Sequence, residues 1–243
     1  MTQNGHANGH NHGDNTEYYS LRAAAIQALL IEKGICTLDD IVTMADKIDS
    51  RSPKDGAKIL ARAWVDPEYK TRLLADAESA FLELGYDLPE TSPKITVVEN
   101  TDDIHNIAVC TLCSCYPRAI IGRPPVWYKG LAYRSKVVVD PRGVLKEFGT
   151  ELDESVQVNV IDSSADYRYL ILPARPAGTD AMTEEELANL ITQESMIGVA
   201  QALSPSLCLS IRLKAVIKIN PFLATPGFLY CYFRVGLASR TSV

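Results

Sequence analysis

Three cysteines lie within six residues, in the run VCTLCSC at 109–115. Cysteines at positions i, i+3 and i+5 after an expected strand can direct three sulfurs at one ion. Three thiolates held this close together repel one another, and a cation of two or three charges removes that repulsion. Soft thiolate ligands favour zinc, Cu(I), iron–sulfur clusters or trivalent transition metals. The run therefore predicts a metal site at Cys110, Cys113 and Cys115.

Zinc is the simplest alternative, but a structural zinc site normally has four protein ligands. The fourth ligand would have to come from outside the cluster, from His105, Cys36, Cys208 or Cys231. None of these belongs to a recognisable ligand pair, and we expect His105 to be exposed or hydrogen-bonded rather than catalytic. A thioredoxin-like redox pair would need a βαβ setting that the sequence does not predict. Three buried free cysteines are the structural alternative, because cysteine packs as a small hydrophobe.

The backbone of the cluster can also supply ligands. The peptide nitrogens of Ser114 and Cys115 lie inside the ring closed by the sulfurs of Cys113 and Cys115. A trivalent ion is a strong enough Lewis acid to replace their protons, which gives a plane of two nitrogens and two sulfurs with Cys110 axial. The position opposite Cys110 would stay open for substrate or water. An open position distinguishes a catalytic metal site from a structural one.

The composition limits the kind of protein that carries this cluster. The 243 residues are 47% hydrophobic and 22% charged, ordinary values for a chain with a sizeable core. The formal net charge of −6 does not favour a nucleic-acid or anionic-membrane partner. All apolar runs are shorter than the about 18 residues of a membrane helix, and the N-terminus lacks a signal-peptide pattern. We therefore expect a cytoplasmic protein in a reducing compartment.

The N-terminal third predicts helices. Residues 1–15 are a Gly-, Asn- and His-rich tail that we expect to be disordered. Residues 16–90 form an expected helical arm, and its first helix, 18–33, has an apolar face and ends at Gly34. Later helix starts are predicted at the Thr37–Asp40 capping box, at Pro53 and at Asp66-Pro67, the last helix running to Leu84.

Beyond the arm, the hydrophobic period changes and strands are expected. Residues 91–202 predict a layered α/β (α+β) domain that carries the metal loop 110–115. Its predicted elements are strands at 95–98 and 104–109, a hairpin over 156–173, helices after Pro124-Pro125 and Asp140-Pro141, and a helix from Thr183 to about Gln193. Residues 203–243 contain five basic and no acidic residues, an atypical apolar tail that is either an interaction segment or out-of-frame readthrough. The fold class is thus α/β.

The cluster and its surroundings resemble the α subunit of nitrile hydratase. The resemblance covers about 18–202 and is carried by several segments as well as the cluster. They are WVDPEYKTRLLAD at 64–76, VCTLCSCYP at 109–117, GRPPVWYK at 122–129, YRSKVVVDPRGVLKEFG at 133–149, RYLILPARPAGTD at 168–180 and MTEEELANLIT at 182–192. The cysteine motif is highly specific.

The resemblance implies hydration of a nitrile to an amide at a low-spin Co(III) or Fe(III) centre. It implies one metal ion per α subunit, held by the sulfurs of Cys110, Cys113 and Cys115 and by the backbone nitrogens of Ser114 and Cys115. It further implies that Cys113 is oxidised to sulfinate and Cys115 to sulfenate, which makes these two the catalytic cysteines. Thr111 stands where the iron enzymes carry serine, which favours cobalt.

The resemblance also implies partners. A nitrile hydratase β subunit would complete the site with two arginines, as a heterodimer or heterotetramer, and a metallochaperone or activator would load the metal. The small-molecule nitrile is the remaining partner. Because no β-like segment is present in this chain, we expect it to be inactive alone.

Two residues of the expected substrate pocket leave alternatives open. Arg118 replaces a tryptophan that nitrile hydratases often carry three residues after the last cysteine, and an arginine favours an anion. The γ subunit of thiocyanate hydrolase resembles CTLCSCYPR here, so conversion of thiocyanate to carbonyl sulfide and ammonia is the second hypothesis. Arg118 could equally form an interface ion pair, and Trp127 could line the pocket or pack against the partner. A degenerate, non-catalytic metal-binding subunit is the third hypothesis, because of the tail.

Overall fold

The computed structural model describes residues 16–89, 92–113 and 115–206, and the chain divides into two units after Ser50. The first unit consists of α1 (Thr16–Glu32) and α2 (Leu38–Asp49). The predicted capping box is present, because Thr37 accepts from the Asp40 N–H and Asp40 accepts from the Thr37 N–H. Gly34 follows α1 with φ of 65°, as the predicted helix end requires.

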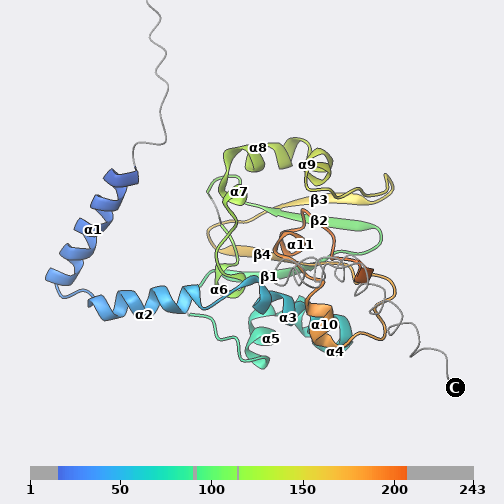
Figure 1. The fold of residues 1–243 in the computed structure, drawn as a ribbon, viewed down its shortest axis with the longest axis horizontal. Coiled ribbons are helices and arrows are strands. Elements are labelled where there is room, and N and C mark those ends of the chain that lie inside the picture. The colour runs from blue at the N-terminus through green and yellow to red at the C-terminus, as the bar shows by residue number, and fades with distance from the viewer. Residues whose placement is uncertain (1–15, 90–91, 114, 207–243) are drawn as a thin grey trace, which may run out of the picture. The chain divides into compact units, whose positions relative to one another are not determined.

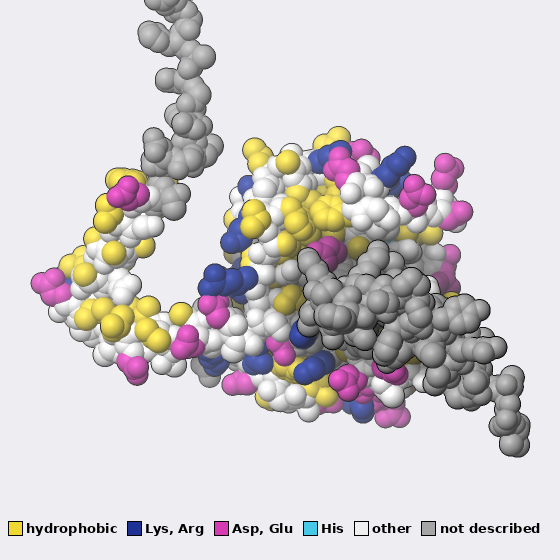
Figure 2. Space-filling model, in the orientation of Figure 1, with side chains coloured by type: hydrophobic (Ala, Val, Ile, Leu, Met, Phe, Trp, Pro, Cys, Tyr) yellow, Lys and Arg dark blue, Asp and Glu magenta, His cyan; other side chains and the backbone are white. Residues whose placement is uncertain are grey.

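Apolar side chains of the first unit are left in solvent. The apolar face predicted for the first helix is exposed, with Leu21 at 65% and Leu29 at 49% of their full accessible surface. Hydrophobic side chains run along both helices (Figure 2). Within the described part of this unit no residue is fully buried, so the two helices have no core of their own.

The second unit, which begins at Arg51, is layered (Figure 1). The helices α8 and α9 form one outer layer, two small sheets form the middle, and α3, α4, α5 and α10 form the other outer layer. The bounds are α3 Pro53–Val65, α4 Pro67–Ala75, α5 Ala77–Glu83, β1 Lys94–Glu99, β2 Ile104–Val109, α6 Arg118–Ile121, α7 Val126–Lys129, α8 Leu131–Val139, α9 Pro141–Glu147, β3 Gln157–Asp162, β4 Tyr167–Leu172, α10 Glu184–Ala188 and α11 Gln193–Ile197. Helices and strands are mixed in one layered unit, as the α/β prediction expects.

Both sheets are parallel pairs. β1 pairs with β4, and β2 pairs with β3. The predicted hairpin over 156–173 is therefore wrong, because its two strands belong to different sheets. The alternation of apolar residues predicts each strand but not its neighbour. The burial of Leu170, Ile171 and Leu172 in succession shows that β4 is covered on both faces, as is typical of parallel strands.

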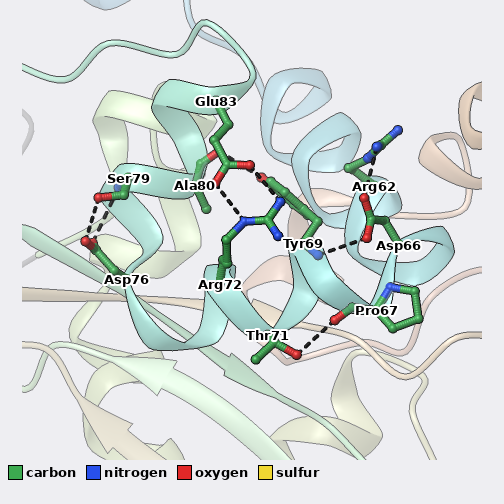
Figure 3. Close-up of polar contacts among 10 residues, drawn as sticks. All are labelled: Arg62, Asp66, Pro67, Tyr69, Thr71, Arg72, Asp76, Ser79, Ala80 and Glu83. Atoms are coloured by element: carbon green, nitrogen blue, oxygen red, sulfur yellow. Dashed lines mark hydrogen bonds and ion pairs between the residues drawn. The ribbon is translucent and has the colours of Figure 1, made fainter.

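Two predicted helices end earlier than expected. The helix predicted from Asp66 to Leu84 is interrupted at Asp76, which has extended backbone and accepts from the Ser79 N–H and hydroxyl (Figure 3). A short acidic side chain competes in this way with the helical hydrogen bonds. The helix predicted to run from Thr183 to about Gln193 ends at Ala188, and Thr192 begins α11 with a second capping box.

The α3 helix packs closely enough to require a glycine. A Cβ atom on Gly56 would lie 2.2 Å from Ile121 Cγ2 and 2.8 Å from Met196 Sδ. On the same helix, Trp64 Nε1 donates to the Pro173 carbonyl at 2.9 Å. These contacts join α3 to α6, to α11 and to the residues after β4. Among the described residues, none of the helices is both long enough and apolar enough to span a bilayer.

Candidate metal centre

The three cysteines converge at the end of β2. The Sγ atoms of Cys110 and Cys113 are 3.2 Å apart, those of Cys113 and Cys115 are 2.9 Å apart, and all three lie within 4.8 Å of one another. Cys110 and Cys115 are buried, whereas Cys113 is exposed. In the part of the chain that the structure describes, they are the one group of three or more His, Cys, Asp or Glu side chains placed closely enough to hold a metal ion.

The spacing of the sulfurs fits a six-coordinate ion. With metal–sulfur bonds of about 2.3 Å, two sulfurs at a right angle lie about 3.3 Å apart, and two at a tetrahedral angle lie about 3.8 Å apart. The measured 3.2 Å and 2.9 Å are closer to the right-angle value. The donor set is soft and anionic, as thiophilic transition metals require. The loop therefore fits a six-coordinate thiophilic transition metal better than tetrahedral zinc.

The Cys115 thiol needs a nearby cation to ionise near neutral pH. Burial, together with hydrogen bonds from Cys113 and Cys110, raises the pKa of the Cys115 thiol to about 12, and the charge of Arg168 opposes this shift only in part. Because a thiolate is the ligand form, a bound metal ion would supply the missing positive charge.

Asp162, at the end of β3, fixes the start of the loop. Its Oδ1 accepts from the Thr111 N–H at 3.0 Å, and its Oδ2 accepts from the Thr111 hydroxyl at 2.5 Å. The parallel register puts Val109 opposite Asp162, so both strands deliver their last residues to the same edge. The sequence analysis missed Asp162, since the signal for it is the parallel pairing that the hairpin prediction excluded.

Helices α7 and α8 bind carbonyl groups on and beside the loop. The Tyr133 hydroxyl donates to Ala108 O at 2.8 Å, and the Tyr128 hydroxyl donates to Cys115 O at 2.7 Å. Arg134 Nη1 donates to Thr111 O at 3.3 Å. Three side chains from this one short segment thus hold the backbone before, within and at the end of the cluster.

The remaining predicted site residues have different surroundings. Ser114, the expected source of a ligand nitrogen, lies outside the described residues. Arg118 is exposed at the first position of α6. Trp127 is half-buried in an aromatic cluster, with ring centroids 4.7 Å from Phe148 and 4.9 Å from Tyr133. The ring of Trp127 therefore packs inside the domain.

His105, one of the possible fourth ligands of a zinc site, is buried and has both ring nitrogens engaged. Nε2 contacts Gly198 O at 2.7 Å, and Nδ1 contacts Asn100 Nδ2 at 3.2 Å. Burial lowers the pKa of His105, and the Gly198 carbonyl opposes this shift. The hydrogen bonding that the sequence analysis expected is present. The other possible ligands Cys208 and Cys231, with most of the tail and residues 1–15, lie outside the described residues.

This chain is similar to known proteins in both sequence and fold. The family model described as "Nitrile hydratase, alpha chain" matches residues 17–200. The low-molecular-weight cobalt-containing nitrile hydratase α subunit of Rhodococcus rhodochrous is 50% identical over 191 residues, which are 78% of this chain and 92% of that protein. The thiocyanate hydrolase γ subunit of Thiobacillus thioparus is 37% identical over 192 residues, covering 75% and 79% of the two chains.

A solved structure agrees with these relatives. A double mutant of the Fe-type nitrile hydratase from Comamonas testosteroni superimposes with a TM-score of 0.72 at 40% identity, covering 78% of this chain and 93% of that one. The family model spans the helices, both parallel sheets and the cysteine loop. The chain belongs to the nitrile hydratase α-chain family, and the loop from Cys110 to Cys115 is its candidate metal centre.

Proposed function

We propose that this chain is the metal-bearing α subunit of a cobalt nitrile hydratase, which hydrates a nitrile to its amide. The convergence of three cysteine sulfurs on one point carries the proposal. Support for cobalt comes from the identity with a relative named as cobalt-containing. The proposal includes one Co(III) per chain, with Fe(III) as the alternative, and a cytoplasmic location in which thiols stay reduced before metal loading.

In this proposal the sulfurs of Cys110, Cys113 and Cys115 and the backbone nitrogens of Ser114 and Cys115 hold the ion. When bound, the cation supplies Lewis acidity that makes the nitrile carbon electrophilic. Cys113 would carry a sulfinate and Cys115 a sulfenate, formed when an external oxidant such as dioxygen oxidises the two thiolates. The sulfenate oxygen of Cys115 would either activate a water that adds to the nitrile carbon, or add to that carbon itself and then be displaced by water, which restores the sulfenate. In both cases the water oxygen becomes the amide oxygen and both water protons end on the nitrogen.

The proposed partner is a β subunit. Exposed apolar residues in the metal loop and at the starts of α7 and α8 support this, because Leu112 is 93%, Val126 90% and Leu131 71% exposed. The uncovered apolar side chains of α1 and α2 support it independently. A patch of this kind marks a protein interface. We propose a heterodimer or heterotetramer, loaded by an activator protein and inactive as a lone chain.

Arg118 supports the second candidate, hydrolysis of thiocyanate. An exposed guanidinium shortly after the cysteines would attract an anionic substrate, and a thiocyanate hydrolase subunit is among the relatives. We propose Arg118 and Trp127 as residues of the substrate pocket. Trp127 would shape the pocket indirectly, because its ring packs against Tyr133 and Phe148. The greater identity to nitrile hydratase subunits favours nitrile hydration.

The first test is the accurate mass of the peptide from Ile95 to Arg118, taken from protein purified with its β subunit under non-reducing alkylation. Two added oxygens on Cys113 and one on Cys115 are expected. Parallel assays with a nitrile and with thiocyanate then decide between the two substrates. Three intact alkylatable thiols, with no cobalt in the purified protein, would refute the oxidised metal centre and favour the degenerate subunit.

A further inference from the structure

Unsatisfied buried polar atoms gather beside the cysteine loop. Among the described residues, two buried side-chain atoms have no hydrogen-bond partner, Arg134 Nε and Ser163 Oγ. Arg134 donates through Nη1 to Thr111 O, and the Ser163 N–H donates to Val109 O at 2.7 Å. Leaving such an atom unpaired is unfavourable. Arg134 contacts the loop itself, at Thr111, whereas Ser163 binds Val109, the residue before the loop, so the observation that bears on the loop is the one at Arg134.

Arg134 completes the fixation of Thr111. Asp162 binds the N–H and the hydroxyl of Thr111, and Arg134 binds its carbonyl, so all three polar groups of this residue are held. Thr111 follows Cys110 directly. Its peptide groups therefore set the path of the chain between the first cysteine and the other two.

The position of Arg134 is fixed by its neighbour. The Tyr133 hydroxyl donates to Ala108 O, which ties the start of α8 to the end of β2. The Arg134 side chain is half-buried, and its guanidinium keeps its charge under all ordinary conditions. A cation thus contacts the loop at Thr111, the residue that follows Cys110.

We propose that Arg134 is a positioning residue of the metal centre, which fixes the Thr111 carbonyl and offsets the negative charge of the cysteine ligands. The inference deepens the proposed function, and its charge-offsetting part rests on that function. Its loop-fixing part applies to the metal-free chain as well. Arginines outside the ligand set act in this way when they orient and stabilise the groups that bind the metal.

A matched control is available on the next helix. Arg142, on α9, donates to the carbonyls of Leu152, Asp153 and Val156, so it also uses a guanidinium to hold a loop. That loop precedes β3, whereas the cysteine loop adjoins its far end. Replacement of Arg142 should therefore loosen the loop over 152–156 and leave the cysteine loop unchanged.

The experiment compares Arg134→Gln, Arg134→Lys and Arg142→Gln with the wild type, each full chain being produced with a β subunit. Cobalt content, the rate of cobalt release to a chelator and the sulfur-to-cobalt absorption band are measured. Arg134→Gln should release cobalt about tenfold faster or more, as is common when a group outside the ligand set is lost. Arg134→Lys, which keeps the charge, should be intermediate, and Arg142→Gln should match the wild type.

Hydrogen exchange of the metal-free chains gives a readout without cobalt. Arg134→Gln should speed exchange in the 109–116 segment, and Arg142→Gln should speed it only around 152–156. The inference would be overturned if Arg134→Gln exchanged hydrogen and released cobalt at the wild-type rates. It would also be overturned if Arg142→Gln changed both rates as much as Arg134→Gln does. A wild-type protein that retains no cobalt would instead refute the proposed function, while the exchange data would still decide whether Arg134 fixes the loop.

Discussion

At the residue scale, the sulfurs of the cluster depend on charges that lie far away in sequence. Cys110 and Cys115 are buried, and burial disfavours the thiolate of Cys115. The carboxylate of Asp162 and the guanidinium of Arg134 hold Thr111 from opposite sides. Neither group belongs to the proposed ligand set, and both contact the backbone between the proposed ligands. We therefore expect the chemistry of the three cysteines to depend on residues that the cysteine motif does not contain.

Replacement of the central cysteine should abolish metal binding. Cys113 lies within 3.2 Å of both other sulfurs, so Cys113→Ala removes the donor that adjoins each of them. We expect loss of cobalt as well as activity, measured by elemental analysis of the purified complex. Cys36→Ala, which changes a free thiol of the first unit, should leave both unchanged. A Cys113→Ala protein with one cobalt per chain would disprove the ligand assignment.

Asp162→Asn should weaken metal retention without unfolding the protein. In asparagine an NH2 group replaces one carboxylate oxygen, so the side chain loses its charge and the acceptor that the Thr111 hydroxyl uses while Oδ1 accepts from the Thr111 N–H. Cobalt content should fall several-fold, in line with losses of about 10- to 100-fold in affinity for comparable groups.

The control for this variant is Asp153→Asn. Asp153 accepts from the Ser155 N–H and hydroxyl in a surface turn, with no contact to the loop. Its replacement should leave cobalt content unchanged. Equal cobalt in the Asp162 and Asp153 variants would show that the Thr111 contact is dispensable.

At the element scale, the two parallel sheets bring the loop and its supports together. β2 ends at Val109 and β3 ends at Asp162, and their pairing makes these ends neighbours. Helix α11 contacts both β4 and β2 and joins the two sheets at one place. Gly198, which ends α11 with φ of 91°, has no room for a side chain, because a Cβ atom would lie 2.0 Å from Asn106 O. The contact between α11 and β2 thus depends on a glycine and on His105.

This contact should make stability depend on pH. The pKa of His105 is lowered in the folded chain, chiefly by burial. The unfolded chain therefore binds the proton more readily, and the contribution of the neutral histidine is present above the unfolded pKa of about 6.5. It is lost as the pH falls below that value towards the folded pKa. Urea unfolding at pH 7.5 and pH 5.5 should show this loss in the wild type.

His105→Gln separates this effect from the titration of carboxylates. The variant should be less stable than the wild type at pH 7.5, because it disturbs the contacts to Gly198 and Asn100. Its stability should change less between the two pH values, since the titrating ring is absent. A variant with the same pH dependence as the wild type would exclude His105 as the source.

At the scale of the whole molecule, the chain has one unit with a hydrophobic core and one unit without. Arg51 to the end of the described residues contains the buried residues of both sheets and of the layers that cover them. The first unit leaves Leu21, Ile26 and Ile35 exposed, with Ile35 at 66%. A helical pair of this kind is stabilised by packing rather than by propensity. Its apolar surface is the strongest argument for a partner chain.

Deletion of residues 1–50 should reduce assembly with the β subunit much more than it affects the remaining fold. We expect thermal unfolding of residues 51–243 to change little, because the buried residues all lie in the second unit. Size-exclusion chromatography of co-produced subunits should show a large loss of complex. A matched deletion of the tail, 203–243, tests whether the tail hinders this assembly, as the hypothesis of a degenerate subunit would require. Full complex formation after the 1–50 deletion would contradict an interface on α1 and α2.

The sequence by itself determined what is local. The capping boxes at Thr37 and Thr183, the strand at 104–109 and the cluster of three cysteines follow from residue types and spacing within a few positions. Local hydrogen bonds and the short ring formed by a CSC run need no other part of the chain. The same local signals failed where a short side chain interrupted a helix, as at Asp76.

Only the tertiary structure decided which elements meet. Strand partners depend on burial against layers that are distant in sequence, so alternation alone cannot distinguish a hairpin from two parallel pairs. The pairing of β2 with β3 brings Asp162 to Thr111, and the packing of α8 brings Arg134 to the same residue from another direction. The sequence therefore contained the proposed metal ligands in one motif. The groups that orient them come from separate elements, because a loop of six residues cannot satisfy its own backbone.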